Sequence, residues 1–214
     1  KKMSNQITKQ NVQFLSEGLT LKGNLFLPEN YDSTKKYPAI IISGSWTTVK
    51  EQMAGLFAER LAKQGFITLA FDFRNFGESE GQPRFFESPS MKKTDIINSV
   101  SYLNSLSIVD KDKIGVLGIC AGSMYTLMAA SEDKRIKAVV TVASWLHDSE
   151  AVKLIYGGEE VLQSKIKAAQ DAKKKRRKRK LSVFIHHQFS IVGEEIRNRF
   201  NTSVIIEKSE MLIW

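Results

Sequence analysis

The chain has 214 residues, 42% of them hydrophobic, which is enough for the packed core of one domain of ordinary size. No apolar run approaches the roughly 18 residues of a membrane span, and residues 1–13 are polar where a signal peptide would be apolar. A single cysteine excludes an internal disulfide. We therefore expect a cytoplasmic protein without a membrane partner, in which the thiol stays reduced.

The formal net charge of +9 is concentrated near the end of the chain. Residues 173–214 hold 11 Lys and Arg against 4 Asp and Glu, whereas the other 172 residues hold 21 against 19. Eight consecutive basic residues, Lys173–Lys180, account for most of this excess. We expect no nucleic-acid partner except through that run, which lacks the interleaved aromatic residues that stack on bases.

The sequence pattern of the first half of the chain predicts two strands, followed by strands that alternate with helices. Residues 37–43 form a continuous apolar run, as in a strand that is covered on both faces. Apolar residues recur at helical spacing between 50 and 64, and that segment closes at Gly65. The expected strands are 12–17, 19–27, 37–43 and 66–71.

The second half continues the alternation. Ser88 is a suitable N-cap for a helix that starts at Pro89 and turns Ile96, Val100 and Leu103 to the core. Strands alternating with helices at this spacing predict an α/β fold, a mainly parallel sheet flanked by helices, with ligands at the carboxyl ends of the strands. The remaining expected elements are strand 113–119, helix 121–132, strand 136–143 and helices at 148–156 and 159–172.

Cys120 lies at the centre of Gly118-Ile119-Cys120-Ala121-Gly122, between a predicted strand and a predicted helix. The pattern small–x–nucleophile–x–small is typical of a nucleophile elbow, usually with Ser at its centre. The turn is sharp and brings strand and helix close together, which requires the two glycines. The Ala121 N–H, at a helix N-terminus, can stabilise an oxyanion or a thiolate. The alternative, a buried structural cysteine, is less favoured by the strand–turn–helix context.

Three blocks follow one another in order: 37–44 (YPAIIISG), with 49–52 (VKEQ) soon after, 72–79 (DFRNFGES) and 110–122 (DKDKIGVLGICAG). Together they resemble the α/β-hydrolase superfamily, specifically its dienelactone-hydrolase-like and YcjY-like branch, over residues 11 to about 156. The middle block is similar to the superfamily pattern D-x-R-G-x-G-x-S, with Asn75 where Gly is usual.

The resemblance implies hydrolysis of a small-molecule ester, lactone or thioester through an acyl-enzyme on Cys120. Ala121 and either Ser45 or Trp46 would donate the backbone N–H groups of the oxyanion hole. Arg74 would shape the neighbouring loop together with Gly77, or would only form a structural ion pair there. No metal or organic cofactor is implied, because no His, Cys and Asp cluster has ligand spacing.

The sequence does not decide which residues act as the catalytic base and acid. The superfamily order is nucleophile, acid, base. His147, His186 and His187 are the candidate bases, and Asp148 is either the acid or a helix N-cap. Glu51 is the nearest analogue of a glutamate that helps to activate the thiol in dienelactone hydrolases, or else a carboxylate in the first turn of a helix.

The C-terminal strands of the sheet are expected to be incomplete. About 70 residues follow strand 136–143, without a convincing strand–Asp or strand–His block. We expect 1–172 to form a partial core with lid helices from about 148, and 173–214 to be a basic tail foreign to the family, as a frameshift would produce. Two functions stay open: a hydrolase weakened by loss of the usual acid and base, and a non-catalytic remnant whose tail binds polyanions. The oligomeric state also stays open.

Overall fold

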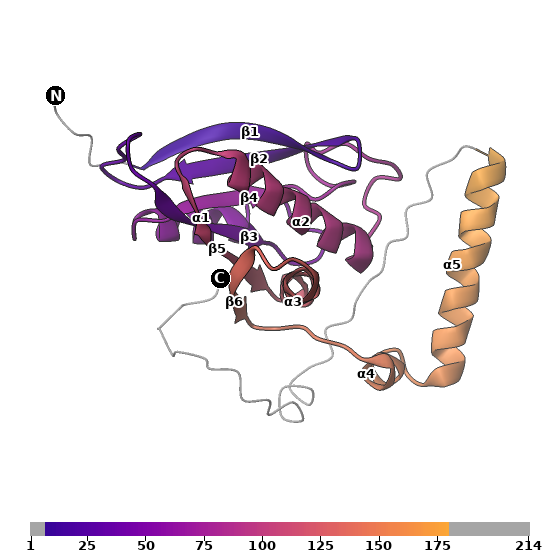
Figure 1. The fold of residues 1–214 in the computed structure, drawn as a ribbon. Helices are drawn as coiled ribbons and strands as arrows, with labels where there is room; N and C mark the ends of the chain where they lie inside the picture. The colour runs from indigo at the N-terminus through magenta and orange to yellow at the C-terminus, as the bar shows by residue number, and fades with distance from the viewer. Residues whose placement is uncertain (1–6, 180–214) are drawn as a thin grey trace. The chain divides into compact units, whose positions relative to one another are not determined.

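The computed structural model describes residues 7–179, whose arrangement is shown in Figure 1. Contacts between residues divide the chain into two units, Lys1–Leu146 and His147–Trp214, and each unit is described by itself. The first unit contains the sheet and the predicted elbow. Two of the candidate bases, His186 and His187, lie outside the described residues.

One six-stranded sheet forms the centre of the first unit, with the strand order β1-β2-β4-β3-β5-β6. β1, β2 and β4 pair antiparallel, whereas β4, β3, β5 and β6 are parallel. The predicted mainly parallel α/β sheet is confirmed, and β6 is its last strand among residues 7–179. The strands are β1 (Thr8–Ser16), β2 (Leu19–Leu27), β3 (Tyr37–Ser43), β4 (Ile67–Phe71), β5 (Val109–Ile119) and β6 (Ile136–Val142).

Helices cover both faces of the sheet because side chains alternate along each strand. In β3, Ile41 packs in a cluster with residues of α2 (Pro89–Ser105) and α3 (Ala121–Glu132), whereas Ile42 packs with α1 (Met53–Ala62). Figure 1 shows α1 behind the sheet and α2 and α3 in front of it. Both clusters are apolar and closely packed, so the sheet is a rigid base for the loops that follow its strands.

The carboxyl ends of the parallel strands meet at one edge of the sheet, as expected for this topology. The register pairs Ser43, the last residue of β3, with Gly118 of β5, and Ile119 with Val142 of β6. The chain therefore leaves β3, β5 and β6 close to Cys120. This edge collects the loop after β3, the turn at Cys120 and the segment that follows β6.

Four predicted boundaries differ from the structure by three residues or more. The helix predicted from residue 50 begins at Met53. The Lys50 N–H donates to the Asp72 carboxylate at 2.8 Å, and this hydrogen bond keeps Lys50 in the loop before the helix. β1 begins at Thr8 and β5 at Val109, each four residues before its predicted start. The helix α5 (Glu159–Arg179) passes the predicted end at residue 172, because Lys and Arg are good helix formers. Residue 173 is thus no element boundary.

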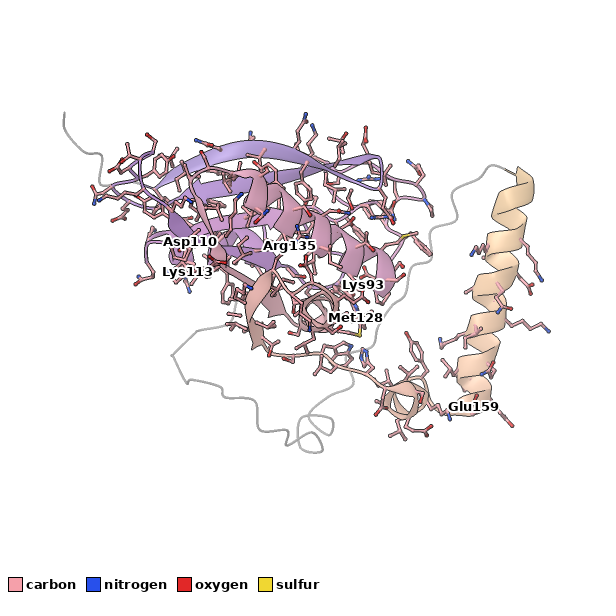
Figure 2. The ribbon with its side chains drawn as sticks, viewed as in Figure 1. Lys93, Asp110, Lys113, Met128, Arg135 and Glu159 are labelled. Carbon is pink, nitrogen blue, oxygen red and sulfur yellow. The ribbon has the colours of Figure 1, made fainter. Side chains whose placement is uncertain are left out.

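The second unit contains α4 (Ser149–Ile155) and α5 among its described residues. Lys153 of α4 is 3.3 Å from a carboxylate oxygen of Glu159, at the start of α5. Figure 2 labels Glu159 at the start of α5. It also labels Lys93 of α2, in the first unit, which pairs with Glu132 of α3 at 2.6 Å.

Residues 7–179 contain no helix with the length and apolar character needed to cross a bilayer.

Candidate active site

The backbone at Cys120 has the geometry of the predicted elbow. Cys120 joins β5 to α3 with φ 54° and ψ −119°, a left-handed conformation that costs a non-glycine residue about 1–3 kcal/mol. Three hydrogen bonds hold it there: its N–H donates to the Val142 carbonyl at 2.9 Å, and its carbonyl accepts from the N–H groups of Ser123 at 3.0 Å and Trp145 at 3.1 Å. The Cys120 side chain is partly exposed.

The two glycines of the turn allow strand and helix to approach each other. A Cβ atom at Gly122 would lie 2.5 Å from the backbone oxygens of both Ser43 and Gly44. A Cβ atom at Gly118 would lie 2.6 Å from the carbonyl oxygen of Gly122 and 2.6 Å from Cα of Ser123. Carbon atoms do not approach backbone atoms that closely, so any side chain here would displace the backbone.

The two predicted sources of oxyanion donors lie at the same edge of the sheet. Ala121 is the first residue of α3, so its N–H has no acceptor within the helix. Ser45 and Trp46 follow the end of β3, where the Ser45 carbonyl accepts a 3.0 Å hydrogen bond from the Thr48 hydroxyl. The Trp46 ring packs edge to face on Trp145 at 5.9 Å between ring centroids. The fold thus brings the loop after β3 beside the turn at Cys120.

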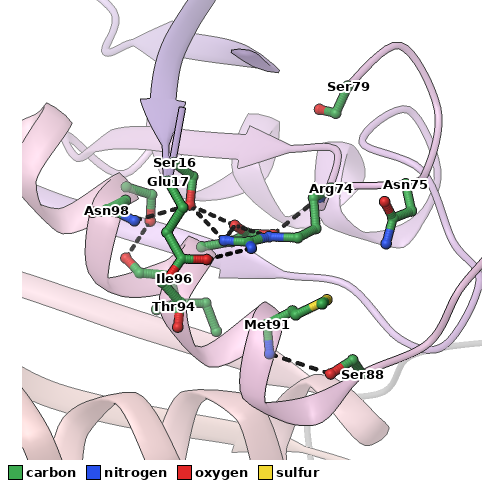
Figure 3. Close-up of polar contacts among 12 residues, drawn as sticks. Ser16, Glu17, Arg74, Asn75, Ser79, Ser88, Met91, Thr94, Ile96 and Asn98 are labelled. Carbon is green, nitrogen blue, oxygen red and sulfur yellow. Dashed lines mark hydrogen bonds and ion pairs between the residues drawn. The ribbon is translucent and has the colours of Figure 1, made fainter. Parts of the chain in front are cut away.

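Arg74 forms the structural ion pair that was one of its two predicted roles (Figure 3). Its side chain is 6% exposed and donates two hydrogen bonds to one oxygen of the buried Asp95, at 2.9 and 2.7 Å. It also donates to the Glu17 carboxylate at 2.5 Å and to the Ser16 hydroxyl at 3.0 Å. Arg74 therefore ties its loop to the end of β1 and to α2.

A second buried carboxylate, Asp72, shapes the same loop. It accepts from the Lys50 ammonium at 2.9 Å and from the Glu78 N–H at 3.0 Å. A Cβ atom at Gly77, where φ is 49°, would overlap this carboxylate, so the glycine is required. Asn75, in the place where the pattern usually has Gly, has φ 73°, a conformation that Asn tolerates better than most residues.

Glu51 belongs to this ion-pair cluster. It lies in the turn before α1, so the prediction of a carboxylate in the first helical turn is wrong. Its exposed carboxylate is 2.8 Å from the Lys50 ammonium. Burial opposes the charge on Lys50, but hydrogen bonds to Glu51, Glu78 and Asp72 outweigh that effect and raise the pKa of Lys50 above its usual value.

His147 and Asp148 begin the second unit. Asp148 is the N-cap of α4, because its carboxylate accepts from the N–H groups of Glu150 at 3.0 Å and Ala151 at 2.8 Å. Burial lowers the pKa of His147 below its usual value, which favours the neutral imidazole that a base requires. Among residues 7–179, no group of three His, Cys, Asp or Glu side chains is placed to hold a metal ion.

Sequence reasoning missed a buried polar group next to the elbow. The Tyr125 hydroxyl of α3 donates to the Glu87 carboxylate at 2.6 Å, and the buried Lys92 of α2 pairs with the same carboxylate at 2.7 Å. Burial first, then Glu87, raises the pKa of Tyr125 far above its usual value, and Cys120 adds to the shift. One signal was available: Lys92 precedes Ile96 by four residues, on the apolar face of its helix.

Comparisons with known proteins agree with the fold. The sequence model of the family described as X-Pro dipeptidyl-peptidase (S15 family) matches residues 17–209. Protein YcjY of Escherichia coli (strain K12) is 42% identical over 142 residues, which are 66% of this chain and 46% of YcjY. Acyltransferase drtE of Aspergillus calidoustus is 33% identical over 140 residues, 65% of this chain and 44% of drtE.

A solved structure extends the similarity to three dimensions. The crystal structure of hypothetical protein PA2218 from Pseudomonas aeruginosa matches with a TM-score of 0.73 and 35% identity, over 83% of this chain and 56% of that one. The alignments thus span less than half the length of the two curated relatives. The strand order, the elbow and the family match lead to one conclusion: this chain belongs to the X-Pro dipeptidyl-peptidase (S15) family, within the α/β-hydrolase superfamily.

Proposed function

We propose that this chain carries the nucleophile of an acyl hydrolase that acts on a small-molecule ester, lactone or thioester. One observation carries the proposal. Cys120 is held in the strained conformation of an elbow, at the N-terminus of α3 and beside the loop after β3. Such backbone strain persists only where the surrounding structure imposes it. Cys120 follows the carboxyl end of β5, and ligands of parallel α/β sheets bind at the carboxyl ends of the strands. A free thiol of this kind suits a reducing compartment such as the cytoplasm.

The chemistry follows from these positions. The Cys120 thiolate attacks the substrate carbonyl carbon, and the carbonyl oxygen becomes an oxyanion. The N–H of Ala121 and the N–H of Ser45 or Trp46 stabilise that charge, and one such donor typically contributes 10²–10³-fold to the rate. The base takes the Cys120 thiol proton as the thiolate forms and gives it to the leaving alcohol or thiol when the tetrahedral intermediate collapses, and the acyl group stays on Cys120. Water then releases the acid. Another acceptor in place of water would give acyl transfer, the activity in the name of drtE.

The general base is the group of this proposed mechanism whose identity is least defined. All three histidines of the chain lie outside the first unit, at positions 147, 186 and 187. We propose that one of them serves as the base and that Asp148, a helix N-cap, contributes little as an acid. Glu51 is occupied by its ion pair with Lys50. If none of the three histidines is oriented toward the Cys120 thiol, only the catalysis of an oxyanion hole and of substrate binding remains, and turnover is then expected to be orders of magnitude below that of a relative with a full triad.

Substitution of the nucleophile tests the proposal. We expect Cys120→Ala to abolish the hydrolysis of p-nitrophenyl acetate at neutral pH, with unchanged far-UV circular dichroism, because the thiol is the attacking group. Mass spectrometry after a single exposure should show one acetyl group, on Cys120, in the wild-type chain and none in the variant. Ser123→Ala, which removes a neighbouring hydroxyl that donates to the Gly118 carbonyl, is the control and should keep the acetylation. Turnover that survives Cys120→Ala would refute the proposal.

The basic run favours one alternative, a non-catalytic protein that binds polyanions. Lys173 and Lys174 lie exposed on α5, at the start of eight consecutive basic residues. If this run is the functional part, the chain should elute from heparin only at high salt, and replacing Lys173–Lys180 by Gln should abolish retention. Elution of both forms at the same low salt would exclude this alternative.

A further inference from the structure

The loop after β3 is fixed at both ends by contacts with neighbouring segments. At its start, the carbonyl oxygen of Gly44 lies 2.5 Å from the position that a Cβ atom at Gly122 would take, against the first turn of α3. At its end, the N–H and the ammonium of Lys50 donate to the two oxygens of the buried Asp72 carboxylate, at 2.8 and 2.9 Å. Both candidate sources of the second oxyanion donor lie between these two ends.

A side-chain hydrogen bond holds the middle of the same loop. The Thr48 hydroxyl donates to the Ser45 carbonyl at 3.0 Å, in a partly buried position. The hydroxyl also lies close to Gly44, because a Cβ atom there would be only 2.6 Å from the hydroxyl oxygen. Gly44 therefore leaves room for the hydroxyl, and Thr48 contacts the residue that in turn lies against α3.

This hydrogen bond determines the orientation of the peptide group between Ser45 and Trp46. The peptide group is trans and planar, so its N–H points opposite to its carbonyl. Since the Ser45 carbonyl is directed at Thr48, the Trp46 N–H is directed to the other side of the chain. The same bond restricts the rotation of Ser45 and so the direction of its own N–H. One hydroxyl thus acts on both candidate donors.

The backbone of the loop is strained beside this bond. Thr47 has φ 51°, a left-handed conformation that a β-branched residue rarely adopts. Such a conformation costs about 1–3 kcal/mol and persists only where surrounding contacts impose it. The hydrogen bond from Thr48 to Ser45 spans Thr47 and is one such contact. Imposed strain of this kind is concentrated at active sites and ligand sites.

We propose that Thr48 is a positioning residue, whose hydroxyl holds the backbone N–H of Ser45 or Trp46 toward the oxyanion formed at Cys120. The inference rests on the proposed function. It adds a group that touches no substrate and acts through the Ser45 carbonyl. Misplacement of a catalytic donor by about 1 Å can cost about 10²-fold in rate, so a fixed peptide group has a measurable effect.

The test compares two reactions of the same thiol. Acetylation of Cys120 by p-nitrophenyl acetate passes through an oxyanion, whereas alkylation by iodoacetamide does not. Thr48→Val removes the hydroxyl and keeps the branched shape of the side chain. We expect its single-turnover acetylation rate to fall about 10–100-fold, while its alkylation rate stays within about 2-fold of the wild-type rate. Far-UV circular dichroism should be unchanged.

Two further variants separate the hydroxyl from the rest of the side chain. Thr48→Ser loses only the methyl group and keeps the donor, so it should retain most of the wild-type acetylation rate. Thr94→Val is the matched control. The Thr94 hydroxyl also donates to a backbone carbonyl, that of Ser90 at 3.1 Å, but it lies in α2. Both rates of Thr94→Val should therefore equal those of the wild-type chain.

Each outcome decides the inference. Wild-type acetylation that depends on Cys120 but is unchanged by Thr48→Val would overturn it and leave the proposed function standing. Alkylation that falls in parallel with acetylation, or Thr48→Ser acetylation as slow as that of Thr48→Val, would show that Thr48 supports the packing of the loop rather than the oxyanion donor. Either result would also overturn the inference. A wild-type chain without any acetylation would overturn the proposed function and this inference together.

Discussion

Gly122→Ala is expected to lower the free energy of unfolding of the first unit by about 2–4 kcal/mol, although alanine is the better helix former by about 1 kcal/mol. The reason is steric. The new Cβ atom would lie 2.5 Å from two backbone oxygens, at Ser43 and Gly44, and neither is the end of a flexible side chain. Helix α3 would have to move away from β3, and the Cys120 turn, which joins β5 to α3, would move with it. Urea unfolding followed by circular dichroism measures the effect.

Gly115→Ala is the matched control, because Gly115 lies in β5, only a few residues before the turn. A Cβ atom there would meet Ala138 at 3.4 Å or more, which is ordinary contact, so stability should change by less than about 1 kcal/mol. Equal effects of the two substitutions would mean that β3 and α3 do not approach each other closely at Gly122. The alkylation rate of Cys120 should also change only in Gly122→Ala, if the elbow holds the thiol in place.

Most elements were predictable because their signals are local. Ser88 and Pro89 predicted the start of α2, and the Ser88 hydroxyl does accept from the Met91 N–H, at 3.4 Å. The elbow was predictable for the same reason. The elbow requires that residues 118 and 122 have no side chain. Both glycines lie within five consecutive residues, so this condition is visible in the sequence.

The buried ion pairs could not be predicted, because their partners are far apart in the chain. Lys50 meets Asp72 over 22 residues, and Arg74 meets Asp95 over 21. The first of these contacts also moves the start of α1 to Met53. A charged residue on the apolar face of a helix, such as Lys92, predicts that a partner exists but does not identify Glu87.

The base and the acid are a different case, because the residues that could supply them lie beyond β6. Asp148 and His147 are the nearest to the sheet in sequence, and the structure gives Asp148 a local task as the N-cap of α4. A helix cap requires only a short acceptor before a helix, so the pattern at Asp148 cannot distinguish a cap from a catalytic acid.

Arg74→Met is the substitution in the loop after β4 from which we expect the largest loss of stability, about 3–5 kcal/mol. It would leave the Asp95 carboxylate fully buried with the Ser16 hydroxyl at 2.6 Å and the backbone N–H of residue 74 at 3.0 Å, but without the guanidinium that pairs with it. The guanidinium also joins Glu17 and Ser16, so three segments lose a common contact (Figure 3). The loss should appear in urea unfolding as a lower midpoint with an unchanged slope.

The chain offers a matched control in Arg135, whose guanidinium forms a two-point contact with Asp133 at 2.9 and 2.6 Å. Arg135 is 39% exposed and its partner is only two residues away, so Arg135→Met should cost less than about 1 kcal/mol. The double variant Arg74→Met/Asp95→Leu should recover much of the loss, because a buried apolar pair carries no unpaired charge. If Arg74→Met costs no more than Arg135→Met, water must reach Asp95 in the folded chain. The stabilising role of Arg74 as a structural ion pair would then have to be abandoned.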